Sequence, residues 1–150
     1  MRIGVISDTH GVLPASVRAA FEGCERIVHA GDVGSLDVLR ELEAIAPVTA
    51  VAGNTDPWGI AGLLDHVARL ELAGVSIVVA HHLEDAVRLH RASPADVLVF
   101  GHTHVPHVED RDGALLLNPG SAVRPRHGAR PTVGLLEVAA RPARARIVEL

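Results

Sequence analysis

Residues 2–54 read RIGVISDTHGVLPASVRAAFEGCERIVHAGDVGSLDVLRELEAIAPVTAVAGN, and their pattern sets the class of the fold. Short apolar runs alternate here with segments whose apolar residues recur at helical spacing. This pattern predicts strands at residues 2–7, 26–30 and 48–52 and helices at residues 14–22 and 35–45, the second capped by Ser35. Such alternation is typical of an α/β fold whose parallel strands are joined by right-handed crossovers.

The second half of the chain predicts hairpins instead of crossovers. Gly74 and the pair Asp112-Gly113 each separate two apolar runs, which is the pattern of a tight β turn. The expected elements are strands at residues 67–73, 75–80, 97–100, 107–109, 114–117, 132–138 and 145–149, and a helix at residues 84–92. We therefore expect one domain over residues 1–150, with two packed sheets and helices outside them.

Composition excludes several classes of protein. Hydrophobic residues make up 48% of the 150 residues, so the chain can form a sizeable core without disulfides. All 14 basic residues are arginine, which excludes lysine chemistry, and the net charge of −4 argues against broad nucleic-acid binding. The sequence has no signal-peptide pattern and no apolar run of about 20 residues. We expect a soluble cytoplasmic protein without a membrane partner.

Residues with metal-ligand chemistry follow five of the expected strands. They are Asp8 and His10, then Asp32, then Asn54 and Asp56, then His81 and His82, and finally His102 and His104. Ligand sites in open α/β sheets lie beyond the carboxyl ends of the strands, so these segments are expected to converge. If the segments are extended, Asp8 and His10 point the same way and can share one ion, as can His102 and His104.

The mixture of imidazole and carboxylate groups indicates a transition metal rather than Mg²⁺ or Ca²⁺. Asp32 is the isolated carboxylate best suited to bridge two ions, because its two oxygens can each bind one. Glycine precedes Asp32, Asn54 and His102, and it allows the backbone to approach an ion or a phosphate closely. Each feature is weak alone, but their occurrence together and in this order predicts a metal site.

The chain carries, in order, the motifs Asp8-x-His10, Gly31-Asp32, Gly53-Asn54-x-Asp56, His81 and Gly101-His102-Thr103-His104. This set resembles the calcineurin-like metallophosphoesterase superfamily. The short length and the segment from Asn118 to Arg126 resemble its small YfcE-type (MJ0936-like) branch of phosphodiesterases. The resemblance extends from Met1 to about Glu137 and implies a four-layer α/β/β/α sandwich of two mixed sheets flanked by helices.

The resemblance also implies two divalent metal ions, with Mn²⁺ expected first and Fe, Zn, Ni or Co as alternatives. It implies one ion on Asp8, His10, Asp32 and His104, and a second on Asp32, Asn54, His81 and His102, with Asp32 bridging. A hydroxide shared by the ions would attack phosphorus in line with the leaving oxygen. Asp32, Asn54 and His102 are the residues we expect to act in catalysis.

Three functions remain open on the sequence. The first is hydrolysis of a phosphodiester in a small molecule or nucleotide, and the second is a phosphomonoesterase or nucleotide pyrophosphatase, which the sequence does not separate from it. The third is a non-catalytic scaffold, as in the small retromer subunit that shares the resemblance. The complete ligand set favours an enzyme over a scaffold. Because small members of the branch often self-associate, a homo-oligomer is a further expectation.

Two positions depart from the family. Thr55 stands where many larger relatives have a histidine that helps to protonate the leaving group, and a hydroxyl is a poor general acid. His82 stands where the branch usually has glycine. We expect His82 to line the pocket, offer an alternative acid or face solvent, rather than to bind a metal.

Other residues near the motifs have more than one interpretation. Arg124 and Arg126 either bind the substrate phosphate, as Arg does in bidentate fashion, or are solvated loop residues. Thr55 and His82 are further candidates for substrate contacts, and Asp56 either orients a ligand or lies in a loop. For Trp58 we expect core packing rather than a stacking face. We expect His29 to be a hydrogen-bonded buried histidine, Thr103 to make local hydrogen bonds, and His66, His90, His107 and His127 to lie on the surface or in loops.

Overall fold

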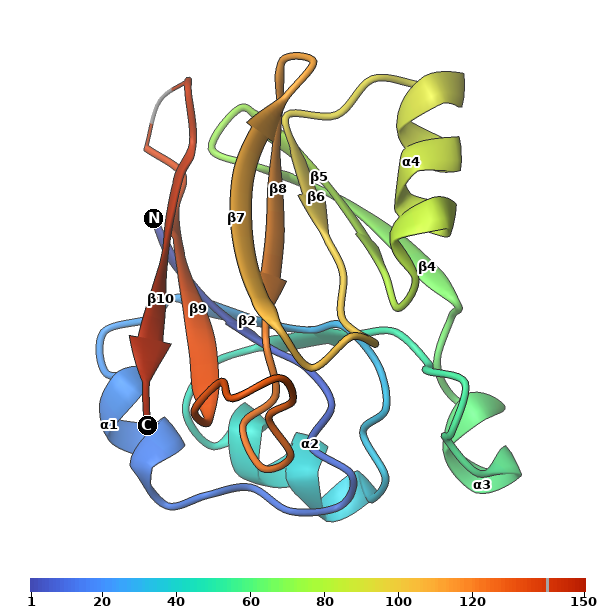
Figure 1. Cartoon of the computed structure of the whole chain (residues 1–150), viewed down its shortest axis with the longest axis vertical. Coiled ribbons are helices and arrows are strands. Elements are labelled where there is room, and N and C mark those ends of the chain that lie inside the picture. Colours follow the sequence, from blue (N-terminus) through green and yellow to red (C-terminus); the bar gives the residue numbers. More distant parts are fainter. Residues whose placement is uncertain (140) are drawn as a thin grey trace.

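The computed structural model describes residues 1–139 and 141–150 and contains two five-stranded sheets that pack against each other (Figure 1). The elements are β1 (Arg2–Ile6), α1 (Ser16–Ala20), β2 (Arg26–His29), α2 (Leu36–Glu43), β3 (Val48–Ala50), α3 (Trp58–Ala61), β4 (Val67–Leu72), β5 (Val75–Ala80), α4 (Leu83–Ala92), β6 (Val97–Val99), β7 (Pro106–Arg111), β8 (Ala114–Pro119), β9 (Thr132–Glu137) and β10 (Arg144–Glu149). No helix in these described ranges is long and apolar enough to cross a membrane.

Both sheets are mixed. The first has the order β10-β9-β1-β2-β3, in which β1, β2 and β3 are parallel and β9 and β10 form the predicted antiparallel pair. The second has the order β4-β5-β6-β8-β7, in which β5, β6 and β8 are parallel. Its two edges are the predicted hairpins, β4 with β5 and β7 with β8. The parallel strands of both sheets therefore carry the loops that can form a site.

Successive side chains of a strand point to opposite faces of its sheet, so each sheet packs on both faces. Ile3 and Val5 of β1 join Ile77 and Val79 of β5 in the core between the sheets. The opposite face of the first sheet packs against α1 and α2, and the opposite face of the second packs against α4. The expected four-layer arrangement of two mixed sheets flanked by helices is confirmed.

Helix ends differ from the prediction where local signals are weak. Ser35 caps α2 as predicted, because its Oγ accepts a hydrogen bond from the Asp37 N–H at 3.2 Å. By contrast, α1 covers only Ser16–Ala20 of the expected residues 14–22, with turns on either side. Helix α3 was not predicted, since four residues are too few to show a helical period.

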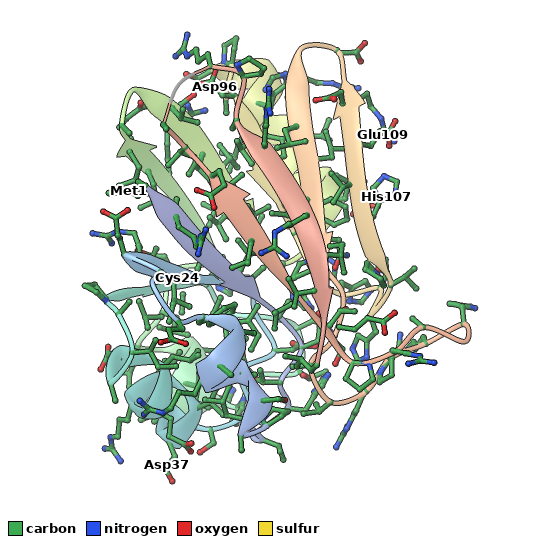
Figure 2. All side chains as sticks on the ribbon, turned by 90° about the vertical axis from the view of Figure 1, so that its left-hand side faces the viewer. Met1, Cys24, Asp37, Asp96, His107 and Glu109 are labelled. Atoms are coloured by element: carbon green, nitrogen blue, oxygen red, sulfur yellow. The ribbon has the colours of Figure 1, made fainter. Side chains whose placement is uncertain are left out.

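Trp58, the first residue of α3, does not pack in the core as expected. Its relative exposure is 93%, because α3 is a single turn that projects from the loop after Asn54 (Figure 1). Figure 2 shows His107 and Glu109 along the edge strand β7. His107 Nε2 lies 2.8 Å from Glu109 Oε2 there, which agrees with the surface position predicted for this histidine.

Candidate metal centre

The seven predicted ligands lie in loops at the carboxyl ends of parallel strands. Asp8 and His10 follow β1, Asp32 follows β2, Asn54 follows β3, His81 follows β5, and His102 and His104 follow β6. Hydrogen bonds join these loops within and between the sheets. The Asp8 N–H donates to the Gly31 carbonyl at 3.0 Å, and the His102 N–H donates to Asp8 Oδ2 at 3.0 Å. The second bond brings the loops of the two sheets to one rim.

One group of ligand atoms consists of Asp8, His10 and His104. The distance from His104 Nε2 to Asp8 Oδ1 is 3.2 Å, and the distance between the Nε2 atoms of His10 and His104 is also 3.2 Å. Asp32 Oδ2 lies 4.0 Å from His10 Nε2, on the side facing the second group. These are the four residues that the resemblance assigned to one ion.

A second group forms around Asp32 and His81. His81 Nε2 lies 3.3 Å from Asp32 Oδ2 and 3.9 Å from Asp8 Oδ1. The ring centroid of His102 is 5.3 Å from that of His81, and His102 Nδ1 is 3.1 Å from Asn54 Oδ1. Asp32 thus lies between the two groups, where a bridging ligand would have to be.

The donor atoms have the spacing and the unmet contacts that a cation would satisfy. Among the described residues, Asp8 Oδ1 and His81 Nε2 are buried without a hydrogen-bond partner of acceptable geometry. Such atoms are costly in a protein interior unless something else contacts them. Two ligands that bind one ion at about 2.0–2.1 Å are separated by about 3.0–3.4 Å. Asp8 Oδ1 is 3.2 Å from His104 Nε2, and His81 Nε2 is 3.3 Å from Asp32 Oδ2. The residues present therefore fit a metal ion.

Hydrogen bonds from the far side of each ring aim the ligand atoms. His81 Nδ1 lies 2.8 Å from the Ala30 carbonyl oxygen, and His104 Nδ1 lies 2.6 Å from the Arg124 carbonyl oxygen. A carbonyl oxygen can only accept, so each Nδ1 carries a proton, and in the neutral ring each Nε2 has a lone pair that can bind an ion. Asp8 is held in a similar way, because the Ser7 hydroxyl donates to its Oδ2 at 2.7 Å.

The expectation that Asp8 and His10 share an ion by lying in an extended segment is wrong in its geometry. The φ angles are +54° at Asp8 and +46° at His10, and they are +70° at His102 and +60° at His104. Asp32 has a φ of +54°. This left-handed backbone is uncommon outside glycine and is concentrated at functional sites. These turns bring Asp8 and His10 into one group, whereas His102 and His104 fall into different groups and do not form the pair that an extended segment would give.

Two of the glycines leave room for ligands of neighbouring loops. A Cβ atom at Gly53 would collide with Asp32 Oδ1 and the Asp32 backbone nitrogen. A Cβ at Gly101 would collide with the Ser7 hydroxyl and approach Asp8 Oδ2 to 2.8 Å. The close approach predicted for these glycines is therefore made to other site residues.

The loop after β3 is fixed by Asp56. Its carboxylate accepts one hydrogen bond from the Gly34 N–H and one from the Gly53 N–H, both at 2.8 Å. The Thr55 N–H donates to Asp32 Oδ1 at 2.9 Å. Asp56 thus orients the backbone around two ligand loops, and Thr55 contacts the site through its backbone while its side chain is exposed.

Burial and neighbouring groups shift the pKa values of Asp8 and Asp32 in opposite directions. Burial raises the pKa of Asp8, and the Ser7 hydroxyl and the nearby histidines only partly offset it. Burial also raises the pKa of Asp32, but the His81 ring and the Thr55 N–H outweigh that effect and hold its pKa well below the usual range. A bound cation should therefore stabilise the ionised form of Asp8 more than that of Asp32.

Arg124 lies close enough to influence the site. Burial lowers the pKa of His10, and the positive charge of Arg124 adds to this effect. Arg124 and Arg126 are exposed, and the described residues form no ion pair with either guanidinium. Neither guanidinium is therefore paired with a carboxylate among the described residues.

Several positioning residues were missed in the sequence because they are ordinary polar residues inside strands and turns. Ser7 orients Asp8, and the Ser121 hydroxyl donates to the Asp8 carbonyl at 2.7 Å. Asn118 Nδ2 donates to the Gly101 carbonyl at 2.9 Å and lies 3.0 Å from the Thr103 hydroxyl, which confirms local hydrogen bonding by Thr103. Only the segment from Asn118 to Arg126 gave a signal for two of these residues.

His29 is the buried, hydrogen-bonded histidine that was expected, and it links the two site loops that follow β1 and β2. Its Nδ1 accepts from the Gly31 N–H at 3.2 Å. The Thr9 hydroxyl donates to the Val33 carbonyl, so His29 Nε2–H donates to Thr9 Oγ1 at 2.9 Å. The ring is neutral, because complete burial lowers the pKa of His29 to about 3.

We expect the metal-free protein to lose stability as the pH falls, with His29 as a main cause. Between pH 6.5 and about 3 the unfolded chain binds a proton on this ring that the folded chain does not, so unfolding becomes more favourable as pH falls. From pH 7 to pH 5 this residue alone lowers the free energy of unfolding by about 2 kcal/mol. Urea unfolding at both pH values should show a smaller decrease in the free energy of unfolding for His29→Gln than for the wild type. His66→Ala, an exposed control, should show the wild-type decrease. Equal losses in wild type and His29→Gln would contradict this account.

Comparisons with known proteins agree with the fold and the site. A family profile described as the calcineurin-like phosphoesterase superfamily domain matches residues 1–141. A probable metallophosphoesterase of Methanothermobacter thermautotrophicus is 40% identical over 137 residues, which cover 84% of this chain and 80% of that protein. Phosphodiesterase MJ0936 of Methanocaldococcus jannaschii is 30% identical over 168 residues, covering 99% of this chain and all of that protein.

Solved structures show the same architecture. The structure of a novel archaeal phosphodiesterase superposes with a TM-score of 0.80 at 28% identity and covers 99% of this chain and 100% of its own. A Vps29 mutant from Entamoeba histolytica superposes with a TM-score of 0.79 at 20% identity and covers 100% of this chain and 99% of its own. At that identity the second likeness concerns the fold alone.

Proposed function

Since the chain belongs to the calcineurin-like phosphoesterase superfamily, as its motifs predicted, we propose that it hydrolyses phosphodiester bonds with the aid of two divalent ions. That it is a metal-dependent phosphoesterase follows from the family, and its relatives include MJ0936 of the predicted small branch. The observation that carries the proposal is the convergence of buried ligand atoms, of which Asp8 Oδ1 and His81 Nε2 have no hydrogen-bond partner among the described residues.

The chain offers two sets of ligands that share one carboxylate. One ion would be held by Asp8, His10, Asp32 and His104, and the other by Asp32, Asn54, His81 and His102. The 3.2–3.3 Å spacing of ligand atoms supports this division, as does the position of Asp32 beside both His10 and His81. We propose Mn²⁺ as the first candidate for both positions, with Fe, Zn, Ni or Co as alternatives.

When bound, the ions would supply a nucleophile at neutral pH by lowering the pKa of water to about 7, and they would offset the charge on the phosphoryl oxygens. The chain's own residues prepare the site for in-line attack on phosphorus. Asp32, Asn54 and His102 would act at the reacting group, Asp32 from its buried position and the other two from the exposed side of the centre. Asn54 and His102 are both exposed, so a substrate can reach them, whereas Asp8 is buried.

Substrate contacts would come from the arginine loop. Arg124 and Arg126 follow β8 and are exposed at the rim, and the Arg124 carbonyl is tied to the ligand His104. A guanidinium there can hold two phosphoryl oxygens at once. The Thr55 hydroxyl is a weak acid, so we propose that the enzyme prefers esters whose leaving group needs no protonation. A phosphate-ester small molecule or a nucleotide fits these requirements.

Hydrolysis of two chromogenic esters tests the proposal. The metal-free protein should be inactive, and with Mn²⁺ it should hydrolyse bis-p-nitrophenyl phosphate with a kcat/KM at least about tenfold above that for p-nitrophenyl phosphate. A reversed preference would support the phosphomonoesterase alternative. If neither ester is hydrolysed with any of the five metals, the catalytic proposal is contradicted and the scaffold alternative gains support.

A further inference from the structure

His82 lies beside two of the predicted metal ligands, His81 and His102, although the branch that this chain resembles usually has glycine at this position. It immediately precedes α4 as the N-cap residue, but its side chain makes no capping hydrogen bond. The ring is half-buried and turns toward His81 and His102. The imidazole of His82 therefore does not stabilise the start of α4, and helix capping does not explain why a histidine occupies this position.

The rings of His81, His82 and His102 lie close to one another. Their centroids are separated by 4.3 Å between His82 and His102, 5.0 Å between His81 and His82, and 5.3 Å between His81 and His102. Each ring offers a nitrogen, and the three nitrogens lie within 4.8 Å of one another. Two imidazoles that bind one ion at about 2.0–2.1 Å have ring centroids about 4.5–5.2 Å apart. The observed separations are close to this range.

We propose that His82 is a third imidazole ligand of the second metal position, alongside His81 and His102, and not the non-ligand that we expected from the sequence. The inference rests on the proposed metal centre and adds a residue that the family motifs do not contain. A single amino acid at this position changes the donor set from two imidazoles to three. Nitrogen-rich sets suit Zn²⁺, Co²⁺ and Ni²⁺, whereas Mn²⁺ is better suited by carboxylate, carbonyl and water. His82 should therefore raise the affinity of this position for Zn²⁺ relative to its affinity for Mn²⁺.

Metal titrations of the metal-free protein test this inference. The variants are His82→Gly, which restores the residue usual in the branch, and His82→Asn, which supplies a capping oxygen for α4 but no imidazole. His66→Ala is the control, because His66 is exposed and outside the groups of potential metal ligands in the described residues. Thermal unfolding of each metal-free variant, followed by circular dichroism, verifies that it folds.

Both His82 variants should bind one of two Zn²⁺ ions at least about tenfold more weakly than the wild type, while the other Zn²⁺ is unaffected. Their Mn²⁺ affinities should change less than about threefold, so the Zn²⁺ preference falls. The visible absorption of the Co²⁺-loaded protein should also change in both variants and stay unchanged in His66→Ala. Equal Zn²⁺ affinities and an identical Co²⁺ spectrum in wild type and variants would overturn the assignment of His82 and leave the proposed function intact. Failure of the wild type to bind either metal would instead overturn both.

Discussion

Asp32→Asn is expected to lower kcat/KM for bis-p-nitrophenyl phosphate by at least about 10³-fold, which corresponds to about 4 kcal/mol of lost transition-state stabilisation. Asp32 Oδ2 faces His81 at 3.3 Å and His10 at 4.0 Å, so it is the carboxylate that both ions would share. An amide lacks the negative charge and the second acceptor oxygen that bridging requires. The variant should fold, because its amide oxygen can still accept from the Thr55 N–H.

Steady-state kinetics with Mn²⁺ and metal analysis of the same samples measure this effect. Asp37→Asn is the matched control, because Asp37, labelled in Figure 2, lies in the first turn of α2 and its side chain is 75% exposed. The control should keep wild-type activity and metal content. Full activity in Asp32→Asn would contradict the catalytic role of Asp32. So would the absence of measurable activity in both the wild type and Asp32→Asn when both bind metal.

Metal binding should raise the melting temperature of the protein by roughly 10 °C or more. An ion present at 1,000 times its Kd stabilises the folded state by about 4 kcal/mol, and each kcal/mol is about 2–4 °C for a domain of this size. The physical reason lies in Asp8 and His81, whose ligand atoms are buried without a partner among the described residues. A bound cation would contact both atoms and so remove the free-energy cost of burying them without a partner.

Thermal unfolding of metal-free protein with and without Mn²⁺ measures the shift. Asp8→Asn should lose most of the metal response, yet it should be no less stable than wild type without metal. Burial raises the pKa of Asp8, so removing that charge relieves the folded state of an unfavourable group. A wild-type melting temperature that does not respond to any of the candidate metals would contradict this prediction.

Most of the fold could be predicted because its signals are local. Parallel strands covered on both faces are continuous apolar runs, and β1, β2 and β5 are buried along nearly their whole length. The hairpin between β7 and β8 was marked by Asp112 and Gly113, both of which have positive φ. Helix α3 carries no such signal, since one turn after Pro57 cannot show periodicity.

The site was predictable in its members but less so in its geometry. Strand ends and donor chemistry were enough to identify the residues that converge, whereas the left-handed backbone at Asp8 and His104 was not visible in the motifs. Trp58 was misjudged because a large apolar residue is usually buried, and here the projecting single turn leaves it in solvent. The position of His82 beside His102 depends on how two strands of the second sheet pair, which a linear sequence does not specify.

The most direct measurement of the central claim is anomalous X-ray scattering from crystals of the Mn²⁺-loaded protein. We predict two peaks about 3.5–4 Å apart, with Asp32 between them. One peak should adjoin Asp8, His10 and His104, and the other His81 and His102. A single peak, no peak, or peaks away from Asp32 would contradict the two-ion centre and the hydrolytic mechanism built on it.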